Sequence, residues 1–596
     1  MKTNSIKLFL FLFASITLML HGCSVDKRER VRPNFILIIT DDQGYGDLGF
    51  HGNPDIKTPF LDSLADMSTR FTQFYVSPVC APTRAALMTG RYALRTGIYD
   101  VYPGGTIMHT SERTIAEILK ENGYRTGIFG KWHLGDNYPF RPVDQGFDES
   151  LVHKGGGIGQ EGDHIQNFLR TDSCYFDPVL MKNGMPEKFS GYCSDIFTDA
   201  ALDFLDENTR NKETPFFLYL SYNTPHTPLQ VPKEYYDRYK ELVIKPENYP
   251  FPENFPTMNA ADLEAAKRVY AMVTNIDDNV SKLYRKLKES DVYENTLLIF
   301  MTDNGPQQYR YNGGFRRKKG SVYEGGTRVP FYIHWKNKFT GKLEISTPAA
   351  HIDILPTLLD ICGIAINPGM KFDGKSLLPL LEGTKEWEER ILINEWSQGF
   401  IQPYQNISVR WGKYKLVGNS EYTEGRSALE LYNITEDPSE MNDISDIHTE
   451  IVNELADKFD EWYEEVIYSE ALVSPPRIIL GSEFENPVVL SRDNWKGAKI
   501  KPILSMDAMG YWDISFARDG MYDASLIYTN KIPSGGLVNI RAGTTQRNLR
   551  VANADSGILK LKNVPFKKGD FMLEAWYESG GQVYSPMYVE VYAHPE

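Results

Sequence analysis

Apolar strand patterns alternate with helical patterns over the first two thirds of the chain. The runs at 35–39, 216–220 and 297–301 each hold five consecutive apolar or aromatic residues, which is typical of strands covered on both faces of a sheet. The segments at 113–122 and 261–289 have the spacing of helices. This alternation predicts an α/β domain over residues 34–389, with helices flanking a large, mostly parallel central sheet.

Two later regions have different patterns. Short strand candidates followed by a helical pattern at 447–466 predict a small antiparallel subdomain with one helix over residues 390–470. After Pro475-Pro476, apolar and polar residues alternate with period two in several segments, which predicts an appended β-sandwich over residues 471–596. This accessory domain is either a carbohydrate-binding module or a structural cover over the edge of the sheet.

The first 22 residues have the pattern of a signal peptide. Lys2 and Lys7 precede an apolar run that lacks the flanks of a membrane-spanning helix. Leu20-His21-Gly22-Cys23 resembles a bacterial lipobox apart from His21, which predicts a lipid on Cys23 and a short tether over residues 23–33. We expect an exported protein, held as a lipoprotein in the periplasm or at the outer-membrane or cell surface. Ordinary signal cleavage, giving a free periplasmic or secreted protein, is the alternative.

The composition is that of a soluble globular protein. The 596 residues, 41% hydrophobic and 24% charged, suffice for about three domains. The formal net charge of -15 argues against nucleic acid as a partner, so an anionic ligand needs a local basic cluster. The densest basic run in the mature chain is Arg316-Arg317-Lys318-Lys319, which is either such a cluster or only a solvated surface.

Five cysteines are too few for a disulfide scaffold. Two of them, Cys174 and Cys193, can pair in an oxidising compartment, and none has the spacing of a zinc site. Cys80 begins a helical pattern that contains Pro82 and ends near Gly90, which places it at a helix N-terminus with Arg84 one turn on. Such a position suits a reactive group that meets an oxyanion, or simply a buried structural thiol.

Polar residues follow four of the buried strand patterns. Because the carboxyl ends of parallel strands share one edge of a sheet, these residues are expected to form one pocket. The residues that supply only oxygen ligands suit Ca²⁺ or Mg²⁺, although helix caps and tight turns use the same residue types. This set is Asp41, Asp42, Asp303 and Asn304.

Three further residues lie in the same strand-end segments. Lys131 and His133 are two positions apart and would face the same side of an extended segment. His226 lies between two prolines, in a rigid loop that suits a proton donor or a purely structural role.

These motifs together resemble the formylglycine-dependent (type I) sulfatase family of the alkaline phosphatase-like superfamily, in particular bacterial exported glycan and aryl sulfatases. The resemblance covers residues 33 to 470 and does not extend into the last domain. The matching segments, in chain order, are Asp41-Asp42, Cys80-Ala-Pro-Thr-Arg84, Gly130-Lys131-Trp132-His133-Leu134-Gly135, the His226 loop, Asp303-Asn304-Gly305, and Lys319-Gly320 before Tyr323-Glu324-Gly325-Gly326. The Gly-rich run at 155–162 has no obvious counterpart and is interpreted as a rim around the site.

The resemblance implies an alkaline phosphatase-like fold and a sulfuric ester hydrolase. Cys80 would be oxidised to formylglycine by a separate maturation enzyme, and residue 80 with Asp41, Asp42, Asp303 and Asn304 would bind calcium or magnesium. Arg84 and Lys131 would stabilise the attacking hydroxyl, His133 would be the base on the second hydroxyl, and His226 with Lys319 would assist the leaving group.

We expect the substrate to be a sulfate ester on a carbohydrate. A phosphatase or phosphonate hydrolase of the same superfamily is one alternative, disfavoured by the complete motif around Cys80. A non-catalytic, glycan-binding surface lipoprotein is the other. It is disfavoured because no residue of the motif set is missing.

Overall fold

The computed structural model describes residues 32–595 apart from positions 102, 211–212, 340–341, 368, 384–386, 400–401, 420–424, 500–504 and 506. The expected signal peptide, Cys23 and most of the tether lie outside the described residues. A search of the described part of the chain found no helix both long and apolar enough to cross a membrane.

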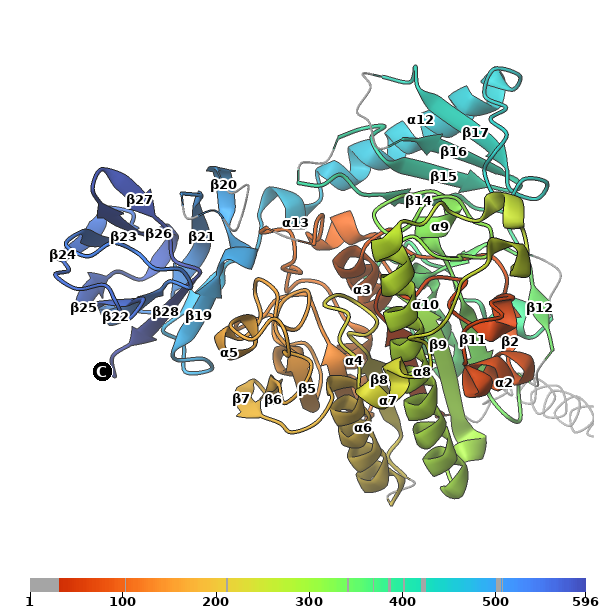
Figure 1. Ribbon diagram of the computed structural model, residues 1–596, viewed down its shortest axis with the longest axis horizontal. Coiled ribbons are helices and arrows are strands. Elements are labelled where there is room, and N and C mark those ends of the chain that lie inside the picture. The colour runs from red at the N-terminus through yellow and green to blue at the C-terminus, as the bar shows by residue number, and fades with distance from the viewer. Residues whose placement is uncertain are drawn as a thin grey trace, which may run out of the picture.

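A ten-stranded sheet forms the centre of the larger domain (Figure 1). Its middle is five parallel strands in the order β9-β1-β8-β4-β5. Their bounds are Thr296–Thr302, Asn34–Thr40, Phe216–Ser221, Arg125–Lys131 and Glu149–His153. Antiparallel pairing adds β11 (Phe331–His334) and β2 (Thr69–Phe71) on one side, with β12 (Glu344–Ile345) beyond them. It adds β6 (Val179–Lys182) and β7 (Met185–Lys188) on the other.

Both faces of this sheet are buried, because successive residues of β1 enter different cores. Leu37 packs with α3 (Cys80–Thr89), α4 (Ile115–Glu121) and α10 (Ile354–Cys362). Ile36 and Ile38 pack on the opposite face with α2 (Pro59–Met67), α6 (Cys193–Thr209) and α8 (Ala260–Glu289). The α/β class with helices on both faces, predicted from the apolar runs, is confirmed.

Local signals explain where two of the helices expected from the sequence begin. α4 starts after Thr114, whose hydroxyl accepts a hydrogen bond from the Glu117 N–H while the Glu117 carboxylate accepts one from the Thr114 N–H. α8 starts after Asn259, which makes the same reciprocal pair with Asp262. Each pair satisfies N–H groups that have no partner within the helix.

A smaller antiparallel sheet follows the large domain. Its order is β14-β15-β16-β17, and α12 (Thr449–Ile467) covers it (Figure 1). The strand bounds are Leu392–Glu395, Ile407–Trp411, Tyr414–Gly418 and Leu429–Asn433. The sequence patterns identified the last three strands and the helix but not β14.

Two antiparallel-rich sheets around one apolar core form the C-terminal region. The first has the order β18-β21-β26-β23-β24, with β20 and β27 attached, and the second has the order β19-β28-β22-β25. The bounds for β18 to β28 are Ile478–Leu480, Val488–Ser491, Lys496–Lys499, Met509–Phe516, Gly520–Ile527, Leu537–Ala542, Thr545–Arg550, Ile558–Phe566, Gly569–Ser579, Gln582–Tyr584 and Tyr588–Ala593. Trp512, Ile514 and Phe516 are all buried, as the period-two pattern predicts.

The sandwich packs on loops of the large domain beside strand β5 (Figure 1). The Tyr588 hydroxyl donates to the Asp163 carbonyl at 2.8 Å, and the Gly104 N–H donates to the Asp493 carbonyl at 2.7 Å. The apolar side chains of Ile107 and Phe140 belong to the core of the sandwich. These contacts make the sandwich a continuous part of the folded body on the side of these loops.

Candidate active site

The ends of β1 and β9 bring two pairs of oxygen-bearing side chains together. Thr40 pairs with Thr302 in parallel register, so Asp41-Asp42 and Asp303-Asn304 leave the sheet side by side. The Asp42 N–H donates to Asp303 Oδ1 at 3.1 Å, and Asn304 Nδ2 donates to Asp42 Oδ1 at 2.8 Å. All four side chains are buried.

Several oxygens of this group have no hydrogen-bond partner although they are buried. They are Asp41 Oδ1, Asp42 Oδ2 and Asn304 Oδ1. Asp41, Cys80 and Asp303 also offer atoms that all lie within 4.8 Å of one another. Because an unpaired buried carboxylate oxygen is costly, this donor set fits an oxygen-preferring cation such as Ca²⁺ or Mg²⁺.

Each of the three carboxylates has one basic partner. Lys131 Nζ lies 2.6 Å from Asp41 Oδ2, an Arg84 guanidinium nitrogen lies 2.8 Å from Asp303 Oδ2, and Lys319 Nζ lies 2.7 Å from Asp42 Oδ1. Burial opposes ionisation of Asp41, yet Lys131 and the other cations hold its pKa well below the usual range. Burial and repulsion by Asp41 raise the pKa of Asp303 to about 7. A cation would relieve that repulsion.

Cys80 is the first residue of α3 and is only 2% exposed. Its Sγ lies 3.4 Å from His133 Nδ1, and His133 Nε2 lies 3.2 Å from the Val101 carbonyl. Burial lowers the pKa of His133, so the ring is neutral, donates through Nε2 and leaves Nδ1 as an acceptor facing residue 80. Burial also raises the pKa of the Cys80 thiol, which disfavours the nucleophilic thiolate.

The extended geometry assumed for Lys131 and His133 is wrong. Lys131 is the last residue of β4, whereas His133 has φ 59°, in the left-handed region. The preceding residue, Trp132, is buried, and its indole N–H donates to the Phe140 carbonyl at 2.9 Å. Both side chains nevertheless reach the site, from different directions.

His226 completes the group from the loop after β8. Its Nδ1 lies 2.7 Å from the Thr227 carbonyl, an acceptor, so Nε2 is the atom that faces Asp42 Oδ2, at 3.7 Å. The structure thus brings together all of the side chains selected from the sequence, namely Asp41, Asp42, Cys80, Arg84, Lys131, His133, His226, Asp303, Asn304 and Lys319.

Two residues at this edge of the sheet were missed. Ser221, the last residue of β8, accepts from Arg84 and donates to the Lys131 carbonyl at 2.8 Å, so it holds Arg84 in place. His153 ends β5, is buried and has an Nε2 without a hydrogen-bond partner. Both follow apolar strand patterns, and that position is the signal that could have identified them.

The Gly-rich run packs against the rings of His133 and His226. A Cβ on Gly156 would lie 3.1 Å from the His133 ring, and one on Gly157 would lie 3.3 Å from the His226 ring. Glycine therefore allows this loop to approach both rings closely, which agrees with a rim around the site. The possible Cys174–Cys193 pair is absent, because both residues are buried free thiols.

Comparison with known proteins agrees with this arrangement. The family model described as Sulfatase matches residues 33–364, and that described as N-sulphoglucosamine sulphohydrolase, C-terminal, matches residues 314–465. Human arylsulfatase A is 31% identical over 427 residues, which cover 64% of this chain and 74% of that protein. Human N-acetylgalactosamine-6-sulfatase is 30% identical over 377 residues, covering 59% of this chain and 66% of that protein.

A solved structure gives the same result in three dimensions. The crystal structure of Ps i-CgsB in complex with k-i-k-neocarrahexaose superposes with a TM-score of 0.63 at 30% identity, covering 74% of this chain and 94% of that one. The Sulfatase match spans more than half of the chain, and the resemblance stated from the motifs is thereby confirmed. This chain belongs to the sulfatase family and is a sulfuric ester hydrolase.

Proposed function

We propose that this chain removes sulfate from a sulfated carbohydrate, using a formylglycine formed from Cys80 and a divalent cation, with calcium preferred. The observation that carries the proposal is the cluster of three ion pairs around Cys80, with three buried carboxylates, three basic partners and unpaired oxygens. A buried thiol with a raised pKa is a poor nucleophile, so the same site supports a modified residue better than an unmodified one.

Asp41, Asp42, Asp303 and Asn304 would hold the cation, together with residue 80. The cation would supply positive charge beside a sulfate group and beside the oxygen of residue 80. The hydrate of a formylglycine would supply one hydroxyl for attack and a second hydroxyl for its own regeneration.

Arg84 and Lys131 would stabilise negative charge next to residue 80. Both are buried and held in position, Arg84 by Asp303 and Ser221, and Lys131 by Asp41. Because they are fixed before the substrate arrives, no reorganisation is needed when charge develops. His133 presents its unprotonated Nδ1 to residue 80 and is the residue positioned to take a proton there.

Lys319 and His226 would act on the leaving oxygen. They approach Asp42 from the side of the site formed by the loops after β8 and β9. A sugar alkoxide is a poor leaving group, so a proton donor or a positive charge at this point is needed more for a sugar sulfate than for an aryl sulfate.

A carbohydrate substrate is supported by the kind of relatives that the chain has. Human N-acetylgalactosamine-6-sulfatase is named for a sugar substrate, and Ps i-CgsB was solved with a carrageenan hexaose. We extend to this chain only the class, a sulfate ester on a saccharide. An exported location, lipid attachment at Cys23 and a separate formylglycine-generating enzyme are parts of the same proposal, supported by the sequence of residues 1–23 and the motif at Cys80.

Mass spectrometry of the peptide that contains Cys80 tests the proposal most directly. The natively matured protein is expected to carry an aldehyde at this position and to release sulfate from sulfated saccharides. Cys80→Ala should lower that activity by about 10⁴-fold or more. Cys362→Ala is the matched control. Cys362 is also a buried cysteine, and the only side-chain hydrogen bond that the described structure gives it is with the Tyr124 hydroxyl. A mature, active protein with an unmodified thiol would refute the formylglycine assignment.

A further inference from the structure

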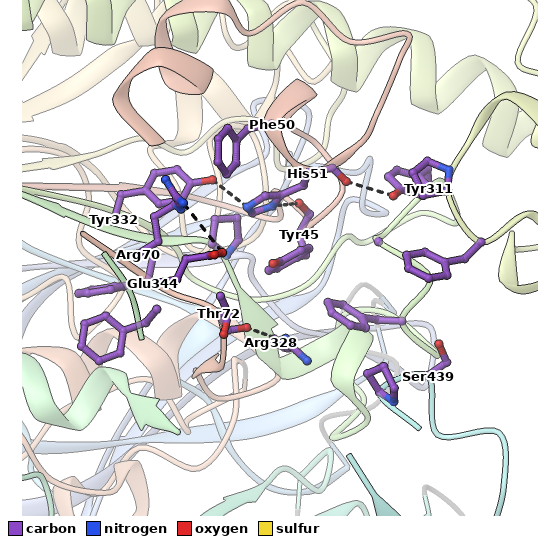
Figure 2. Close-up of a pocket in the computed structure, with 18 residues that line it drawn as sticks. Tyr45, Phe50, His51, Arg70, Thr72, Tyr311, Arg328, Tyr332, Glu344 and Ser439 are labelled. Carbon is purple, nitrogen blue, oxygen red and sulfur yellow. Dashed lines mark hydrogen bonds and ion pairs between the residues drawn. The ribbon is translucent and has the colours of Figure 1, made fainter. Parts of the chain in front are cut away.

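A second pocket lies outside the catalytic group. Its volume is about 430 Å³, and it opens beside strands β2 and β11, against the loops that follow β1 and β9 (Figure 2). We call it the aromatic pocket. None of the residues that hold the charges around Cys80 lines it. Its size falls within the range of about 300–1,000 Å³ that is usual for small-molecule sites.

Aromatic rings form about half of its wall. Tyr45 stacks on His51 with 3.9 Å between ring centroids (Figure 2). Phe315 packs edge-on to Tyr45, with 4.9 Å between ring centroids. Phe50 and Phe251 line the same pocket and are 38% and 53% exposed. Exposed phenylalanines over a concave aromatic surface are ready to stack on a ligand.

The backbone is shaped to hold these rings. A Cβ on Gly313 would lie 2.9 Å from the Tyr45 ring, and one on Gly314 would lie 3.2 Å from the Phe251 side chain. Phe251 itself has φ 58°, a left-handed conformation that is unfavourable for an aromatic residue. A large apolar residue kept both strained and exposed is more consistent with contact to a ligand than with packing.

Two arginines line the pocket, and Arg70 is the one available to a ligand, because Arg328 pairs with the buried Glu324 at 3.2 Å. Arg70 lies with its guanidinium 4.9 Å from the Phe50 ring centroid, and its Nε has no hydrogen-bond partner. Its carboxylate neighbour Glu344 is 3.9 Å away and mostly exposed, so the pair is weak. Arg328 lies 4.6 Å from the Phe315 ring centroid. His51 adds no charge at neutral pH, because burial lowers its pKa to about 4.

The basic run noted in the sequence continues this surface. Arg316, Arg317 and Lys318 line an adjoining cavity of about 250 Å³ that shares Phe315 with the aromatic pocket. Among the described residues, neither Arg317 nor Lys318 forms an ion pair with a carboxylate. Lys318 instead donates to the Gln307 carbonyl at 2.7 Å and lies 4.8 Å from the Tyr309 ring. A positively charged surface thus extends beyond the pocket in a chain whose net charge is -15.

We propose that the aromatic pocket is a non-catalytic binding site for an anionic polysaccharide. Phe50 and Phe251 would stack on the apolar face of a sugar ring, and Arg70 would bind its sulfate or carboxylate group. The basic run would hold the next anionic unit of the same chain. This binding goes beyond the proposed function and does not depend on modification of Cys80.

Affinity electrophoresis of the full-length protein tests this site. The Cys80→Ala background prevents turnover during the run, and the gels contain iota-carrageenan, chondroitin 6-sulfate, hyaluronan or dextran. We expect retardation by the anionic polymers and none by dextran. Retardation by hyaluronan as well as by the sulfated polymers would identify a site that accepts either a carboxylate or a sulfate group. Retardation by the sulfated polymers alone would identify a site for sulfate.

Phe50→Ala/Phe251→Ala is expected to weaken retardation about tenfold, equivalent to about 1.4 kcal/mol. Phe484→Ala is the matched control, since Phe484 has a similar exposure of 58% on the sandwich. In the native background the double variant should keep its kcat/KM on a small aryl sulfate. Arg70→Gln provides a second variant if the double variant fails to fold, and it should remove the salt-sensitive part of binding.

Three results would overturn the proposal. Unchanged retardation of both the phenylalanine and the arginine variants would exclude the pocket. A loss in Phe484→Ala but not in the pocket variants would place binding on the sandwich. Equal retardation by dextran would exclude an anionic ligand. Absence of sulfatase activity, by contrast, would count against the proposed function and leave the binding result interpretable.

Discussion

Replacement of Lys415 by methionine should destabilise the junction between the small sheet and the segment that follows Lys319. Lys415 Nζ in β16 lies 2.8 Å from Glu324 Oε1 and 2.9 Å from Glu440 Oε1, and all three side chains are at most 1% exposed. Glu324 begins α9 (Glu324–Thr327), five residues after Lys319. Methionine is also unbranched and is only one atom shorter than lysine, so the variant mainly removes the charge and its hydrogen bonds.

The distances give the size of the effect. At an effective dielectric constant of about 20, charges 2.8 Å apart attract by about 6 kcal/mol. Much of this offsets the desolvation of the ions, and loss of one partner from a buried pair costs about 3–5 kcal/mol. Lys415→Met leaves Glu324 with Arg328 as a remaining cation at 3.2 Å, whereas Glu440 loses the cation that the described structure places beside it. We therefore expect a loss of about 3–5 kcal/mol in the stability of this junction.

The deficit should depend on pH in a defined direction. Burial already raises the pKa of Glu440 to about 7, against the attraction of Lys415. Removing Lys415 raises that pKa further, so the folded state takes up a proton more readily than the unfolded state. A raised carboxyl pKa lowers stability as pH rises, so the deficit should be smaller at pH 5 than at pH 8.

Native-state hydrogen exchange of β15 to β17 measures this local stability. Lys413→Met is the control, because Lys413 lies in the same hairpin but is exposed. If the exchange free energies of Lys415→Met stay within about 1 kcal/mol of the parent from pH 5 to pH 8, the buried ion pairs do not stabilise the junction and the reasoning fails.

Three further predictions concern the site and the sandwich. Chelation with EDTA should lower both sulfate release and the thermal midpoint, and calcium should restore both, because the buried oxygens Asp41 Oδ1 and Asp42 Oδ2 lose their ligand. An unchanged midpoint would argue against a resident metal. Lys319→Met should lower kcat/KM by about 10²–10⁴-fold on a sugar sulfate and far less on 4-nitrophenyl sulfate, whereas equal losses would show that Lys319 does not act on the leaving group. Asp493→Asn should raise the thermal midpoint more at pH 8 than at pH 5. Burial and repulsion by Asp136 raise the pKa of Asp493, so the folded protein keeps a proton that the unfolded chain loses. Holding that proton costs the folded state up to about 1.4 kcal/mol more for each unit by which the pH rises. Parallel midpoint curves for variant and parent would contradict this.

The sequence predicted the features that depend on local pattern. Apolar runs identified β1, β8 and β9, and short motifs at their ends identified the charged residues of the site. Because parallel strands end at the same edge of the sheet, the residues that follow these strands lie close together, and their position could be predicted from local patterns.

The features that were missed depend on contacts between distant segments. The turn at His133 lies beside the buried Trp132, and the role of Ser221 is visible only once Arg84 lies beside it. The aromatic pocket combines segments near residues 45–51, 70 and 251 with 311–315 and 328, which lie outside the motifs identified from the sequence. These positions depend on tertiary packing, which cannot be predicted from local sequence preferences.

The burial of Cys80 has a consequence for the order of events during biogenesis. At 2% exposure and within hydrogen-bond distance of His133, its side chain is beyond the reach of another enzyme once the domain has folded. Under the proposed function, conversion to the aldehyde must therefore occur on the nascent or unfolded chain. The partners of residue 80 extend from Asp41 to Lys319, and long-range contacts of this kind form slowly, which leaves time for modification. The yield of active protein would then depend on the rate of modification relative to the rate of folding. A chain that folds first would be stable and correctly folded but inactive.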